Sequence, residues 1–107
     1  MDDLAAGECF YRDREGQPLD LMEWARLYEN HDYRCVSETE HQGVLVRTSW
    51  EGLDAGVIGA GSMFHTGVRR DGRWTPVWAA PYPCTLIEAE AAHELIAAQV
   101  RQDRSTY

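Results

Sequence analysis

Hydrophobic residues recur at helical spacing near the start of the chain and predict a first helix over residues 21–29. Leu21, Trp24 and Leu27 would share one face of this helix, and charged residues occupy the other. The Asp-Leu-Met-Glu segment that opens it has the pattern of a capping box, in which the acidic side chains satisfy free backbone N–H groups. A shorter apolar segment at residues 8–12 is typical of a strand or an anchored arm.

Four strands are predicted next, the first from alternation of apolar and polar residues and the second from its β-branched residues. These cover residues 33–40, 44–50, 64–70 and 73–80. The first two would pair as a hairpin, and the Asp71-Gly72 dipeptide predicts a tight hairpin turn between the last two. Pro76 cannot donate a ladder hydrogen bond, so the last strand is expected at a sheet edge. Residues 51–62 hold four glycines and predict a long irregular loop.

A second capping box, Thr85 to Glu88, opens a longer helix predicted over residues 86–102. Its buried face is expected to carry Ile87, Ala91, Ala92, Leu95, Ile96 and Val100. Its solvent face is expected to carry Glu90, His93, Glu94 and Arg101. The sequence therefore predicts a small α+β domain of about four antiparallel strands, with an N-terminal and a C-terminal helix packed on the sheet.

The composition is that of one globular domain, with 107 residues of which 44% are hydrophobic and 26% charged. No stretch approaches the roughly 18 apolar residues of a membrane span, and the acidic N-terminus lacks the pattern of a signal peptide. Cys9, Cys35 and Cys84 are widely spaced and odd in number, which favours free thiols in a reducing compartment. We therefore expect a single cytoplasmic domain over residues 1–107, with no membrane partner.

Charge narrows the range of partners. The formal net charge is −8, and every basic residue is an arginine. Residues 1–40 hold eleven acidic residues and only four arginines, so the negative charge is concentrated there. Binding to a phosphate backbone needs clustered cations, so we expect no direct nucleic-acid binding. The absence of lysine also excludes a Walker-type phosphate loop and Schiff-base chemistry.

Candidate chemistry is sparse. The four histidines and three cysteines show none of the spacings of a zinc motif, so we expect no metal and no cofactor. Cys84 precedes a helix N-terminus, where a thiol pKa falls, but burial as a packing residue is the favoured interpretation. The glycines of loop 51–62 lead into a strand rather than a helix, unlike a phosphate cradle. Paired glutamates, such as Glu90 and Glu94, are expected on a solvated face. We therefore predict no catalytic residues.

Aromatic residues are the more informative group. Trp74 and Trp78 have the same parity along their strand, which predicts that both project from one sheet face. If that face is open, it would be a protein-contact surface; the alternative is that the rings form the core. The interaction candidates are Trp50, Asp54, Phe64, His65, Trp74 and Trp78.

Several short motifs resemble a family of small uncharacterised proteins from actinobacterial phages and related actinobacterial genomes. The shared pattern includes Glu-Trp-Ala-x-Leu within the first predicted helix, a Thr-x-Trp-x-Gly-Leu-Asp element at residues 48–54, and Ala-x-x-x-His-Glu over residues 89–94. The chain departs from the family at the glycine-rich loop, where the family has a Gly-Pro-Pro turn. The resemblance implies an origin and brings no catalytic residues; small acidic phage proteins of this kind are often accessory factors that bind a host protein.

We therefore expect a non-enzymatic accessory factor that binds a host protein through an acidic or aromatic surface, for example an inhibitor of host defence or of a nucleic-acid-handling protein in the host cytoplasm. One alternative is a small-ligand-binding protein or minor enzyme. Its pocket would lie under loop 51–62 and use Asp54, His65 or Cys84. Another alternative is an assembly subunit, a homo-oligomer whose sheet edge pairs with itself.

Overall fold

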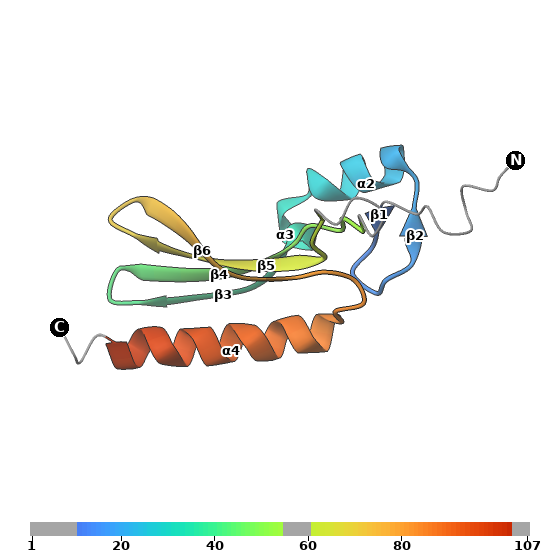
Figure 1. Ribbon diagram of the computed structural model, residues 1–107. Helices are drawn as coiled ribbons and strands as arrows, with labels where there is room; N and C mark the ends of the chain where they lie inside the picture. Colours follow the sequence, from blue (N-terminus) through green and yellow to red (C-terminus); the bar gives the residue numbers. More distant parts are fainter. Residues whose placement is uncertain (1–10, 55–60, 104–107) are drawn as a thin grey trace, which may run out of the picture.

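A four-stranded antiparallel sheet in the order β3-β4-β5-β6 forms the centre of the computed structural model, which describes residues 11–54 and 61–103 (Figure 1). The strands are β3 (Cys35–His41), β4 (Val44–Trp50), β5 (Phe64–Arg70) and β6 (Arg73–Ala80). Asp71 and Gly72 have φ values of 53° and 77°, the backbone of a tight hairpin turn. The predicted sheet is confirmed, and β6 with its Pro76 is an edge strand.

Helices cover the two faces of the sheet unequally (Figure 1). Helix α4 (Leu86–Asp103) runs along the length of one face and contacts β3, β4 and β5. The short elements of the N-terminal half gather on the other side, at one end of the sheet. They are β1 (Tyr11–Arg12), β2 (Pro18–Leu19), α2 (Leu21–Tyr28) and α3 (His31–Arg34). The predicted α+β fold with helices before and after the sheet is confirmed.

Two local predictions need correction or completion. Tyr33 and Arg34 were predicted to start a strand but belong to helix α3, because the Asn30 side chain accepts a hydrogen bond from the Tyr33 N–H and caps a new helical turn. Of the predicted strand at residues 8–12, the structure describes only Tyr11 and Arg12, which form β1, and the rest lies outside the described residues. Both predicted capping boxes are present, at Asp20–Glu23 and Thr85–Glu88.

The core consists of two apolar clusters with a polar layer between them, and side chains of α2 and α3 also pack against the first cluster. Trp50, Met63, Phe64 and Ala89 form the first cluster, and Val46, Val68 and Val100 form the second. His93 lies between the clusters and is fully buried. Its Nδ1 lies 2.8 Å from Thr48 Oγ1 and its Nε2 lies 2.9 Å from Thr39 Oγ1, while Thr48 also bonds Thr66.

The predicted orientation of α4 was partly wrong. Ala89, His93, Ala97 and Val100 form its fully buried face, with Ala92 and Ile96 beside them. Ile87, Ala91 and Leu95 were expected to be buried and are exposed, whereas His93 was expected in solvent. Apolar residues occur around almost the whole helix, so hydrophobic spacing alone could not select the face. The small side chains of the buried face let α4 approach the sheet closely.

Candidate functional site

The outward face of α4 carries a row of exposed apolar side chains at helical spacing, Ile87, Ala91 and Leu95. The exposed fraction is 76% for Ile87 and 73% for Leu95. We refer to these three residues as the outward row. Fully burying one large aliphatic side chain is worth roughly 1.5–3 kcal/mol, so the row is a surface whose apolar area a partner could cover.

Acidic side chains surround the outward row. Glu90 and Glu94 lie on one flank and Glu88 on the other, and all three are exposed. Glu88 also accepts a hydrogen bond from the Thr85 N–H at 2.9 Å, which fixes it at the start of the helix. The row is therefore apolar along its centre and negatively charged along both flanks over its first three turns.

The residues predicted for interaction fall into separate environments. Trp50 and Phe64 are fully buried in the first core cluster. For these two residues the alternative prediction, that the aromatic rings form the core, is the correct one. Trp50 Nε1 donates to the Arg12 carbonyl at 2.9 Å, which secures the ring inside the fold. Asp54 forms an ion pair with Arg12 at 2.7 Å. None of these three presents a free group to a partner.

Trp74 and Trp78 lie on opposite faces of the sheet, contrary to the prediction from their parity. Trp78 pairs with Thr66, but Trp74 pairs with Arg69, because the ladder shifts register between Thr66 and Gly67. This bulge adds one residue to β6 and reverses the alternation beyond it. Trp78 consequently packs against the first core cluster, whereas Trp74 is 43% exposed on the face away from α4.

His65 belongs to that same open face and is bound to Glu51. The distance between His65 Nε2 and Glu51 Oε2 is 2.8 Å. The other Glu51 oxygen lies 3.5 Å from the Tyr28 hydroxyl, and Trp24 Nε1 donates to the Glu51 carbonyl at 2.9 Å. Helix α2 thus fixes Glu51, and Glu51 fixes the histidine ring.

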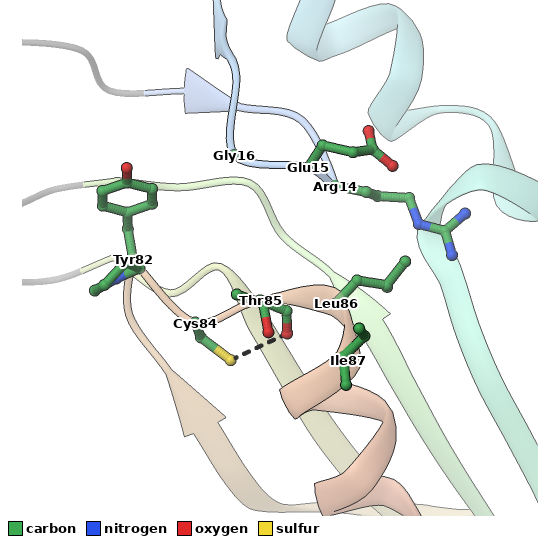
Figure 2. Close-up of a pocket in the computed structure, with 9 residues that line it drawn as sticks. Arg14, Glu15, Gly16, Tyr82, Cys84, Thr85, Leu86 and Ile87 are labelled. Atoms are coloured by element: carbon green, nitrogen blue, oxygen red, sulfur yellow. Dashed lines mark hydrogen bonds between the residues drawn. The ribbon is translucent and has the colours of Figure 1, made fainter.

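Cys84 lies in a cleft of about 470 Å³ between the turn at Arg14–Gly16 and the start of α4 (Figure 2). Its Sγ is 3.6 Å from the Thr85 carbonyl oxygen. Burial, with a smaller contribution from the Glu88 carboxylate, raises the pKa of the thiol rather than lowering it. His93 is held by threonines in the core and cannot act as its base. The cleft therefore holds a protonated thiol at neutral pH.

The three residues of the ligand-site alternative each have their own partner. Asp54 pairs with Arg12, His65 with Glu51, and Cys84 with a backbone carbonyl, and no hydrogen bond joins any two of them in the described part of the chain. Residues 55–60 of the glycine-rich loop lie outside the described residues. Across 11–54 and 61–103, no three His, Cys, Asp or Glu side chains gather closely enough to hold a metal ion. The helices in these ranges are too short or too polar to cross a membrane.

Comparison with known proteins found no relative of this chain. No family model matches the chain, and neither the curated proteins nor the solved structures contain a significant match. The outward row is the surface that the sequence interpretation missed, although all three of its residues had been singled out. The sequence did carry a signal for this surface, because the helix has more apolar residues than one buried face needs.

Proposed function

We propose that this chain is a non-enzymatic protein-binding accessory factor that docks through the outward face of α4. The observation that carries the proposal is the outward row, two aliphatic side chains about three-quarters exposed on a helix whose opposite face is core. An amphipathic helix face of this kind commonly fits an apolar groove in a partner protein.

Charge indicates the character of that groove. Glu88, Glu90 and Glu94 flank the row, and the chain has a net charge of −8, so a groove with a basic rim is complementary. Pairing of two α4 helices would bring the same glutamates against each other, which disfavours self-association through this face. Proteins that handle nucleic acid carry basic surfaces, and an acidic chain is steered toward them.

The finer form of the proposal is therefore an inhibitor of a nucleic-acid-handling or defence protein in the host of an actinobacterial phage. Support comes from the acidic flanks and from the sequence resemblance described above. The ligand-site alternative has weaker support, because Asp54, His65 and Cys84 engage separate partners.

The test compares two double variants of the full chain. Ile87→Ser with Leu95→Ser removes the large side chains of the outward row. Leu21→Ser with Met22→Ser is the matched control, since these α2 side chains are 54% and 75% exposed. Wild type and both variants are immobilised, exposed to an actinobacterial extract, and the retained proteins are identified by mass spectrometry.

We expect at least one basic protein to be retained by wild type and the α2 variant but not by the α4 variant. Calorimetry with that purified protein is expected to show a loss of affinity of about tenfold or more for the α4 variant. Affinity of the wild type is expected to fall as salt rises. The proposal fails if the two variants retain the same proteins, or if light scattering shows a wild-type dimer that only the α4 variant dissociates.

A further inference from the structure

A small pocket lies on the open face of the sheet, away from α4 and from the outward row. Its volume is about 130 Å³, and it is lined by Arg34, Arg47, Ser49, His65, Gly67 and Trp74. Arg47 pairs with Gly67 and Ser49 with His65 across β4 and β5, so these four residues share one face. The intervening Thr48 bonds His93 of α4 on the opposite face.

The lining residues come from four elements, with His65 and Gly67 on β5. Arg34 ends α3, Arg47 projects from β4, and Trp74 reaches in from β6. Trp74 lies over Gly67, where an added Cβ would come within 3.3 Å of the indole ring. The Arg47 guanidinium stands 5.0 Å from the indole centroid, within the range of a cation–π contact. Glycine at position 67 thus lets the ring lie against the sheet as a flat wall.

Two nitrogen atoms of the lining residues are buried without a hydrogen-bond partner in the described structure, Arg34 Nε and His65 Nδ1. Buried polar groups in folded proteins nearly always have a partner, so each exception needs an explanation, such as a bound water or ion. The Arg34 side chain donates a hydrogen bond to the Tyr28 carbonyl oxygen, and its guanidinium lies over the Tyr28 ring. No described carboxylate forms an ion pair with Arg34. The pocket therefore keeps an unneutralised guanidinium on a chain of net charge −8.

Two carboxylates near the pocket already have partners of their own. Glu38 pairs with Arg47 at 2.7 Å, and Glu51 pairs with His65 at 2.8 Å. A ligand would thus meet the Arg34 guanidinium, which no described carboxylate neutralises, the Arg47 guanidinium shared with an exposed glutamate, and the Ser49 side chain. Two guanidinium groups and a hydroxyl that line one pocket from different elements suit a tetrahedral oxyanion, whereas a planar carboxylate is satisfied by one bidentate arginine.

From this geometry we infer that the pocket binds the phosphate group of a small anionic ligand. A cavity of about 150 Å³ holds a molecule the size of benzene, so 130 Å³ accommodates one phosphate group but not a whole nucleotide. The remainder of a phosphate ester would extend over the exposed face of Trp74.

The test titrates the full chain with inorganic phosphate, with phenyl phosphate and with acetate at low ionic strength. Binding is followed by calorimetry and by the NMR signals of the arginine Nε–H groups and of the Trp74 indole. Arg34→Gln removes the free cation, and Arg47→Gln, at a side chain 31% exposed, is a second variant that folding tolerates more readily. Arg73→Gln is the matched control, since Arg73 is exposed and does not line the pocket.

We expect phosphate to bind more tightly than acetate and to shift the Trp74 indole signal. Arg34→Gln and Arg47→Gln are each expected to weaken phosphate binding by about tenfold or more, and Arg73→Gln by less than about twofold. Tighter binding of phenyl phosphate than of phosphate would indicate an ester as the natural ligand, and equal binding a free anion.

Three results would overturn the inference. They are absence of phosphate binding at tens of millimolar, equal affinity for acetate and phosphate, and equal losses for the pocket variants and Arg73→Gln. Absence of binding would mean that water satisfies Arg34 and His65. Thermal unfolding of each variant confirms that a lost affinity does not reflect a lost fold.

Discussion

Gly52 is the residue with the least room for change. Its φ is +68°, and an added Cβ would lie 2.4 Å from Trp50 Cζ2 and 2.7 Å from the Arg12 carbonyl oxygen. Gly52→Ala is therefore expected to lower the free energy of unfolding by about 3 kcal/mol, from backbone strain together with overpacking. Gly43→Ala is the control, because φ is +86° there but no atom lies within 4 Å of the added Cβ. We expect a loss of about 1 kcal/mol for the control; equal losses in urea denaturation would contradict the argument.

His93 makes the stability depend on pH. Burial lowers its pKa below the ordinary value of a histidine, and nearby Glu94 opposes this shift only in part. In the unfolded chain His93 binds a proton near pH 6.5, whereas in the folded chain it binds that proton only at lower pH. The free energy of unfolding is thus expected to be unaffected by His93 above about pH 7 and to decline below about pH 6.5, by at most about 1.4 kcal/mol per pH unit.

His93→Gln isolates this effect, because glutamine can bond both threonines but does not titrate. Urea denaturation at pH 7.5, 6.5 and 5.5 is expected to give a flatter pH profile for the variant than for the wild type. Parallel profiles would show that His93 does not oppose protonation.

At the scale of the element, the start of α4 depends on its capping box. Thr85 Oγ1 accepts from the Glu88 N–H at 3.1 Å, and the Glu88 side chain accepts from the Thr85 N–H. Thr85→Ala is expected to cost about 1 kcal/mol in unfolding free energy, and Thr85→Ser less than half of that. Thermal unfolding followed by circular dichroism measures both; a serine variant as weak as the alanine variant would argue against the hydroxyl cap.

Elements with strong local signals could be predicted from the sequence. Alternation located β3, β-branched residues located β4, the Asp71-Gly72 dipeptide located the last hairpin turn, and the two capping boxes located α2 and α4. What could not be predicted depends on contacts between elements. Pro76 and Gly67 pair beside the bulge in β6, but Pro76 was interpreted only as a sign of an edge strand, so Trp74 and Trp78 were assigned to one face.

The candidate sites were harder to predict than the fold for the same reason. The outward row was expected to be buried, because α4 has apolar residues on two faces. Only its packing against the sheet determines which of the two faces is buried. Arg34 and Arg47 lie far apart in sequence and approach His65 only through α3 and the strand pairing.

At the scale of the whole molecule, the net charge of −8 opposes compactness. The described ion pair Arg47–Glu38 lies near the surface and contributes little, whereas Arg12–Asp54 is partly buried. Salt screens the general repulsion, so the free energy of unfolding in urea at pH 7 is expected to rise by about 0.5–1 kcal/mol between 10 and 200 mM sodium chloride. A decrease over this range would mean that specific ion pairs outweigh the repulsion.

The different depths of the tryptophans give the chain a built-in optical reporter. Trp50 is wholly buried, whereas Trp74 is 43% exposed and has the arginines Arg47 and Arg69 within 6 Å of its ring centroid. Iodide, an anionic quencher, is attracted to those cations and reaches Trp74 but not Trp50. A Stern–Volmer plot of the folded chain therefore curves downward, and unfolding straightens it by making all the indoles equally accessible.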